Sequence, residues 1–381
     1  MTVRKTPSLA VLAGAAALVT LAACDSKSDP AGASAGGGPI KVSASDTACE
    51  VSATTAGAGN LTFEITNKGT KVTEFYLYAE GDRIMGEVEN IAPGLNRRLI
   101  VEVADAGKYQ TACKPGMSGT GIRGDFTVTG GVAKQNDSNA QKAQATKSYA
   151  DYIANNTSAL QDETGKFADL VKAGKVDEAK AAYARTRVYY ERIEPVAEKF
   201  GDLDPAIDVR EADLEPNQQF TGFHRLEKDL FQTGLQPDSG QIADKLVTDV
   251  KDLVAKTKTL ELSALDLANG AKGLLDEVAT GKITGEEEAF SHTDLWDFQA
   301  NVDGSKGAIT ALRPVLQAKD PALVSTLDKE FANVQGLLDK QRAGDGFKSY
   351  TELSQDQVKE FASAVDALSE PLSKVAEVVS K

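Results

Sequence analysis

The chain has 381 residues, 41% of them hydrophobic, which is enough for two domains with substantial cores. Acidic residues outnumber basic ones by 56 to 42, giving a net charge of −14. Such a surface repels nucleic acid and favours cationic ligands, so we expect no nucleic-acid partner. The same charge is ordinary for an exported protein, and it supports metal binding without requiring it.

The N-terminus has the features of a bacterial export signal. Two basic residues precede the apolar run Leu9–Ala23, which is too short for a membrane span, and small residues lead into Cys24. This pattern predicts a lipoprotein signal peptide over residues 1–23, with lipidation of Cys24 after cleavage. Residues 24–39 would be a flexible tether to the outer face of the cytoplasmic membrane. The alternative is an ordinary secretory peptide with an incidental cysteine.

Residues 40–130 alternate between apolar and polar side chains, as Leu61, Phe63 and Ile65 do. Turn signals such as 92–94 (Ala-Pro-Gly) separate several runs of this kind. Short strands at this spacing predict a β-sandwich of about 90 residues. The polar segment 131–147 has no periodicity, and we expect it to be a linker.

From residue 148 the apolar residues recur at intervals of three and four, which is the period of a helix. No strand-like block interrupts this half, so residues 148–381 are predicted to form an all-α bundle. Its predicted helices cover part of 148–171 and then 177–200, 217–233, 239–280, 284–301, 303–318, 320–341 and 354–380.

His224 and Glu227 are the most informative pair in this half. The chain has two histidines, and this one lies three residues before a carboxylate within a helical pattern. Residues i and i+3 share one face of a helix, about 5–6 Å apart. One imidazole nitrogen and one carboxylate oxygen could therefore converge on a single metal ion. Facing helices would supply the other ligands.

Other acidic groups in the helical half have more than one interpretation. Glu191 and Glu194 form a second i, i+3 pair beside Pro195, which should kink the helix. From local sequence alone we interpret this pair as a solvated acidic face. The run 286–288, three glutamates, would open a helix and complement its dipole. His292 is a further candidate ligand, as is the nearby Asp294, although a buried histidine with its hydrogen bonds satisfied is commoner.

Four separated motifs, at residues 190–195, 201–208, 222–231 and 291–304, together resemble the imelysin-like domain. With the β half in front, the chain resembles EfeO-type components of bacterial iron uptake, whose architecture is a cupredoxin-like domain followed by an imelysin-like helical domain. In that family the His-x-x-Glu pair is regarded as the metal-binding centre. The resemblance implies the ligands Glu191, Glu194, Asp208, His224, Glu227 and Glu287. One imidazole with several carboxylates suits iron or manganese.

The β half has two cysteines, Cys49 and Cys113, which would be a disulfide or metal ligands. The loop that begins at Cys113 resembles a cupredoxin ligand loop. The β half has no histidine, however, so the ligand set of blue-copper proteins is missing. The resemblance instead implies an altered site, which could hold a second metal such as copper, formed by Cys49, Glu74, Cys113 and Met117.

We therefore expect a lipid-anchored, non-enzymatic protein that captures Fe²⁺ or Fe³⁺ and passes it to a membrane permease. The resemblance also implies a haem-containing peroxidase as a partner in the same system. One alternative is a metal-dependent peptidase of the imelysin type, but Lys228 stands where the inverted zinc motif needs histidine. Another alternative is a copper-binding surface protein built on the β-sandwich.

Overall fold

The computed structural model describes residues 38–130, 140–214 and 217–381. The predicted signal peptide, Cys24 and nearly all of the tether lie outside these residues. In the described part of the chain, no helix has both the length and the apolarity needed to cross a membrane.

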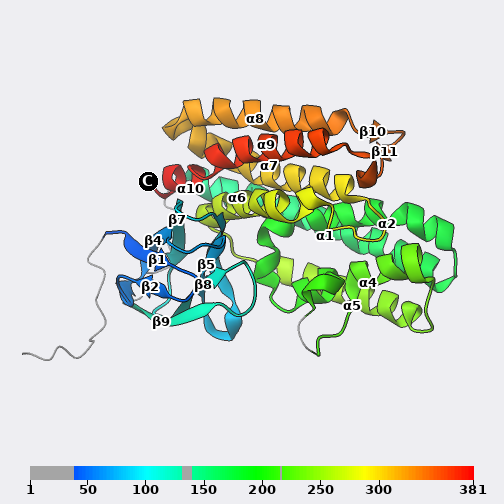
Figure 1. Ribbon diagram of the computed structural model, residues 1–381, viewed down its shortest axis with the longest axis horizontal. Coiled ribbons are helices and arrows are strands. Elements are labelled where there is room, and N and C mark those ends of the chain that lie inside the picture. Colours follow the sequence, from blue (N-terminus) through cyan, green and yellow to red (C-terminus); the bar gives the residue numbers. More distant parts are fainter. Residues whose placement is uncertain (1–37, 131–139, 215–216) are drawn as a thin grey trace, which may run out of the picture. The chain divides into compact units, whose positions relative to one another are not determined.

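The N-terminal region is a β-sandwich of two sheets (Figure 1). One sheet has the strand order β2-β1-β4-β7 and the other has the order β3-β9-β8-β5-β6. The strands are β1 (Ile40–Ala44), β2 (Cys49–Val51), β3 (Thr55–Gly57), β4 (Gly59–Asn67), β5 (Thr73–Tyr78), β6 (Ile84–Ile91), β7 (Asn96–Val103), β8 (Gly107–Pro115) and β9 (Ile122–Thr129).

The alternation in the sequence explains this sandwich, because successive side chains of a strand point to opposite faces. Phe63 of β4 lies 5.1 Å from Phe75 of β5 and 5.6 Å from Phe126 of β9, measured between ring centroids. These three rings join the inner faces of the two sheets into one core. The predicted β-sandwich is confirmed.

The second region is helical, as predicted, and its longest helix, α1, packs against α2, α5 and α7. Helix α1 begins at Ala140, inside the segment that we expected to be a linker. The α-helices are α1 (Ala140–Lys172), α2 (Val176–Glu191), α3 (Leu203–Asp208), α4 (Gly222–Lys228), α5 (Ser239–Thr257), α6 (Ala264–Thr280), α7 (Asp294–Lys319), α8 (Pro321–Asp339), α9 (Gln355–Leu372) and α10 (Val375–Ser380).

Short elements connect them and refine several predicted boundaries. Helix α2 ends at Glu191 because Pro195 has no N–H to continue the ladder, and a 3₁₀ segment, η2, covers Glu194–Phe200. The predicted helix 239–280 is two helices, and Ser263 caps the second with a capping box. The other short elements are η1 (Glu80–Asp82), η3 (Glu211–Asp213), the π-helical η4 (Asp229–Thr233), η5 (Lys282–Thr284), η6 (Tyr350–Glu352) and the hairpin β10–β11 (Arg342–Ala343, Gly346–Phe347).

The acidic run 286–288 does not open a helix, contrary to prediction. Gly285 and His292 both have left-handed backbone, with φ of 78° and 58°, and α7 starts only at Asp294. The segment between them is a loop that folds back against α4. This difference decides the role of the glutamates, because a loop can turn their carboxylates inward.

Candidate metal centre

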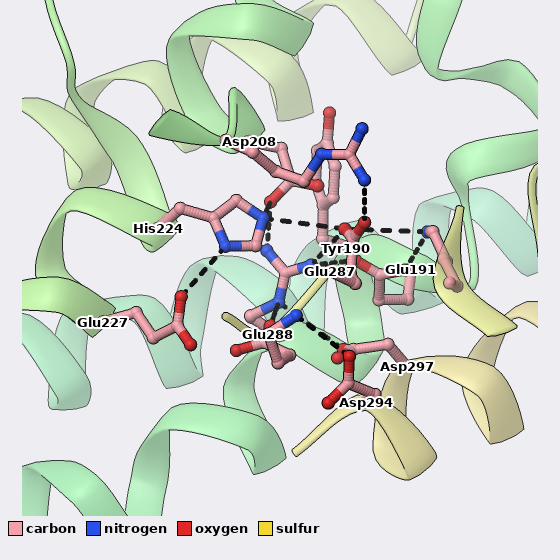
Figure 2. A network of polar contacts seen from close by, with 12 residues as sticks. Tyr190, Glu191, Asp208, His224, Glu227, Glu287, Glu288, Asp294 and Asp297 are labelled. Atoms are coloured by element: carbon pink, nitrogen blue, oxygen red, sulfur yellow. Dashed lines mark hydrogen bonds and ion pairs between the residues drawn. The ribbon is translucent and has the colours of Figure 1, made fainter. Parts of the chain in front are cut away.

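Four elements converge on one buried polar cluster: the end of α2, the end of α3, helix α4 and the loop that precedes α7 (Figure 2). Helix α4 can approach α3 closely because its first residue, Gly222, has φ of 80° and no side chain. A Cβ there would lie 2.1 Å from the carbonyl oxygen of Ile207. This close approach brings His224 on α4 next to Asp208, the last residue of α3.

The imidazole of His224 has one satisfied nitrogen and one unsatisfied nitrogen. Its Nδ1 lies 3.3 Å from Glu227 Oε2. Its Nε2 has no hydrogen-bond partner in the part of the chain that the structure describes, although the side chain is only 1% exposed. This nitrogen lies 3.6 Å from Asp208 Oδ1 and 3.6 Å from Glu287 Oε1. Figure 2 shows the ring with Glu227 on one side and Asp208 and Glu287 on the other.

Glu227 is fully engaged within the protein. Its Oε1 accepts hydrogen bonds from the backbone N–H groups of Phe290, at 2.9 Å, and Ser291, at 2.7 Å. Its Oε2 faces His224 Nδ1. A carboxylate in this position typically orients a metal-binding histidine from behind. The geometry therefore gives Glu227 an orienting role, whereas the sequence suggested that both side chains converge on one ion.

Within residues 38–130, 140–214 and 217–381, two sets of side chains have ligand atoms within 4.8 Å of one another and could hold a metal ion. One is Asp208, His224 and Glu287, and the other is His224, Glu227 and Glu288. The first set uses the free Nε2 of His224 and is adjacent to a cavity. The second set is completely buried and already hydrogen-bonded through Glu227. We therefore take the first set as the candidate metal centre.

The guanidinium of Arg187 provides one of the positive charges inside the cluster, and its side chain is completely buried. Its Nη atoms contact Glu191, Asp208 and Glu287, the last at 3.3 Å. Its Nε lies 2.6 Å from Glu288 Oε1 and 3.5 Å from Asp297 Oδ1. One guanidinium therefore contacts five carboxylates, because like charges can be buried together only around a cation.

Lys282 of η5 is the second internal cation. Its Nζ lies 2.8 Å from Glu191 Oε2 and 2.8 and 2.7 Å from the two oxygens of Glu194. Asn301 Nδ2 donates to the same two carboxylates, at 2.9 and 2.7 Å. Glu191 is 0% exposed, so the interpretation of this pair as a solvated face is wrong. Glu191 and Glu194, two of the six predicted ligands, are therefore hydrogen-bonded to Lys282.

Neighbouring charged groups lower the pKa of Glu287 and raise the pKa of His224. Burial alone would raise the pKa of Glu287, but Lys282, His224 and Arg187 hold that pKa well below its usual range. Burial and Arg187 lower the pKa of His224, whereas Glu227, Glu287 and Asp208 raise it, to about 9 in balance. In the metal-free state the carboxylate of Glu287 is therefore ionised and the imidazole of His224 is protonated at neutral pH.

A cavity of about 480 Å³ adjoins the centre and gives access to it. Its walls include Asp208, Glu287 and Lys282, and nine of its sixteen lining residues are acidic. Glu74 and Met117 of the β half also line it. Such an acidic, low-dielectric cleft raises the local concentration of cations.

The structure separates the four residues predicted as ligands in the β half. Cys49 and Cys113 form a disulfide that joins the two sheets, so as they stand their sulfurs are not thiolates. Cys113 lies opposite Phe75 on the neighbouring strand, and both side chains point into the core. Glu74, the residue before Phe75, points to the other face of the sheet. Because neighbouring side chains of a strand alternate, Glu74 cannot join the cysteines on one ion. The predicted four-ligand site is therefore not formed.

Comparison with known proteins agrees with this architecture. The family model described as imelysin matches residues 145–375, and the one described as a cupredoxin-like domain matches residues 14–128. The iron uptake system components EfeO of Escherichia coli O157:H7, of Escherichia coli strain K12 and of Shigella flexneri are each 40% identical to this chain over 342 residues, 88% of this chain and 90% of theirs. The chain belongs to the EfeO family. The expected resemblance is confirmed.

A solved structure of reduced auracyanin from Roseiflexus castenholzii covers 24% of this chain and 97% of its own, with 17% identity and a TM-score of 0.21. This likeness carries no conclusion for the EfeO-family chain.

Sequence reasoning missed several residues of this EfeO-family centre. Arg187 lies four residues before Glu191, a spacing that indicates an ion pair on one helix face and could have pointed to it. Glu288 was attributed to a helix dipole, because a helix was expected to begin there. Lys282 is 91 residues from Glu191, and no local pattern connects them.

Proposed function

We propose that this chain binds iron at Asp208, His224 and Glu287 and delivers it to a membrane permease of the same uptake system. The observation that carries the proposal is the position of His224 Nε2, which is buried, makes no hydrogen bond shorter than 3.5 Å within the described residues and faces two carboxylates from two other elements. A metal ion bound between these atoms as a ligand would take the place of the proton on Nε2. The relatives named as iron uptake components support iron as that ligand.

The chemistry of the donor atoms suits iron as the transported substrate. One imidazole nitrogen and two carboxylate oxygens form a mostly hard ligand set. Asp208 and Glu287 also contact Arg187, but a carboxylate oxygen has a second lone pair that stays available. Binding at Nε2 requires the neutral imidazole, so iron would displace one proton. The bound ion would then replace the positive charge of that proton.

The location and the partners are part of the same proposal. We propose that lipidated Cys24 anchors the chain at the outer face of the cytoplasmic membrane, where it would work with the permease and a haem-containing peroxidase. The signal pattern and the names of the relatives support this arrangement. The proposed role is binding and delivery without catalysis. A peptidase of the zinc-motif type needs two histidines at one site, and the second histidine of this chain is in the backbone turn at His292.

A second metal in the β half is proposed only for the protein with its disulfide reduced. Reduction would free the thiols of Cys49 and Cys113, which could then bind a soft ion such as copper. Copper titration of the protein after reduction of the disulfide measures whether the two thiols bind copper.

Anaerobic Fe²⁺ titration of the full chain tests the iron proposal, with His224→Gln as the variant. We expect the loss of one equivalent, or a fall in its affinity of at least about 10-fold, since even outer-shell changes cost that much. His292→Asn is the matched control, because asparagine tolerates the left-handed backbone at that position. Equal binding by the wild type and His224→Gln would remove the centre from the proposal.

A further inference from the structure

The ammonium group of Lys282 occupies a position that resembles a metal site. Three carboxylate oxygens, one from Glu191 and two from Glu194, lie within 2.8 Å of its Nζ. The side chain is almost completely buried, and a fourth carboxylate oxygen, Glu287 Oε1, lies 3.9 Å away. A group of oxygens around one positive charge is how proteins hold a hard cation.

Glu287 connects this position to the iron centre. The same oxygen, Oε1, lies 3.9 Å from Lys282 Nζ and 3.6 Å from His224 Nε2. A carboxylate between two neighbouring cation positions is typical of two-metal sites, whose ions are about 3.5–4 Å apart. In helix bundles such sites are built from acidic residues and a histidine–glutamate pair on facing helices. Glu191, Glu194 and the His224–Glu227 pair supply these residue types.

We propose that Lys282 is a tethered cation that fills the second of two metal positions and so restricts this centre to one transported metal ion. The inference rests on the proposed iron binding at His224. A lysine carries one charge on a flexible chain, whereas a metal ion would carry two or three. The lysine therefore balances Glu191 and Glu194 and leaves Asp208 and Glu287 for the transported ion.

Two side chains of α7 next to this position have buried oxygen atoms that make no hydrogen bond among the described residues. They are both carboxylate oxygens of Asp297, one of which lies 3.5 Å from Arg187 Nε, and Oδ1 of Asn301. The two residues are one turn apart on α7 and share a face of that helix. Asn301 Nδ2 already donates to Glu191 and Glu194, so its side chain adjoins the ammonium group.

The test compares Mn²⁺ binding by the full-length wild type, Lys282→Met and Lys272→Met. Lys272 pairs with Asp276 on α6 outside the centre, so it is a matched control. Equilibrium dialysis gives the number of bound ions, and electron paramagnetic resonance distinguishes an isolated Mn²⁺ from an exchange-coupled pair. We expect Lys282→Met to bind one more equivalent than the wild type and to show the coupled signal. Lys272→Met should match the wild type.

The double variant Lys282→Met/Glu194→Gln locates the extra ion, because it should lose the added equivalent and keep the first. If Lys282→Met is not folded by circular dichroism, Lys282→Gln takes its place in the same titration. Equal stoichiometry in the wild type and the folded Lys282 variant overturns the inference. A wild type that binds no ion while Lys282→Met binds one overturns the proposed iron centre and keeps the role of Lys282. Failure of both to bind overturns both.

Discussion

Gly222→Ala should damage both the stability of the protein and its metal centre. The added Cβ would lie 2.1 Å from the carbonyl oxygen of Ile207 and 2.5 Å from its carbonyl carbon. These are backbone atoms, so no side-chain rotation relieves the contact. Helix α4 must move away from α3, and this movement increases the 3.6 Å separation between His224 Nε2 and Asp208 Oδ1.

The expected loss of stability in Gly222→Ala is the sum of two separate costs. A left-handed φ costs an L-residue roughly 1–2 kcal/mol. Overpacking in a closed region adds about 1–3 kcal/mol. Gly234→Ala adds backbone strain without a close contact, because Gly234 has φ of 78° and ψ of 158° and a Cβ there would meet nothing within 4 Å among the described residues. We therefore expect Gly222→Ala to lower the free energy of unfolding by about 2–5 kcal/mol. Gly234→Ala should lower it by about 1–3 kcal/mol.

Urea denaturation of the metal-free protein measures the stability, and Fe²⁺ titration under native conditions measures the centre. Weakened iron binding should accompany Gly222→Ala and be absent from Gly234→Ala. If the two variants lose the same stability and bind iron alike, the close approach of α4 to α3 does not position His224, and the reasoning is refuted.

Three further predictions concern the buried charges and the disulfide. Arg187→Met leaves five carboxylates without their shared cation and should lower the free energy of unfolding, measured in urea, by about 3–5 kcal/mol. Its control, Arg313→Met, breaks an exposed pair with Asp328 and should lower that free energy by less than about 1 kcal/mol. The pKa of His224 rises on folding from 6.5 to about 9, so its contribution to metal-free stability, at most about 3 kcal/mol, is complete below pH 6.5 and is lost as pH rises through 9. A stability difference between wild type and His224→Gln that does not change with pH would contradict this. Reduction of the Cys49–Cys113 disulfide, whose cysteines are 64 residues apart, should lower unfolding free energy by about 4 kcal/mol, and neither cysteine should react with iodoacetamide beforehand.

The sequence by itself determined the architecture and the identity of the central histidine. The alternation of Leu61, Phe63 and Ile65 predicted a strand with one buried face, because side-chain direction in a strand depends only on position along the chain. The spacing of His224 and Glu227 placed both on one helical face for the same local reason. Resemblance to the family then added Asp208 and Glu287, which the structure brings to His224 Nε2.

Only the tertiary structure decided which of these side chains are available to bind a metal ion. Local sequence suggested that Glu191 and Glu194 face solvent, but Lys282, 88 residues from Glu194, buries and pairs them. The Phe290 and Ser291 amides donate to Oε1 of Glu227, so this oxygen is already hydrogen-bonded within the protein. Spacing along a helix reports which side chains share a face, whereas the partner that a buried charge finds depends on elements packed from elsewhere in the chain.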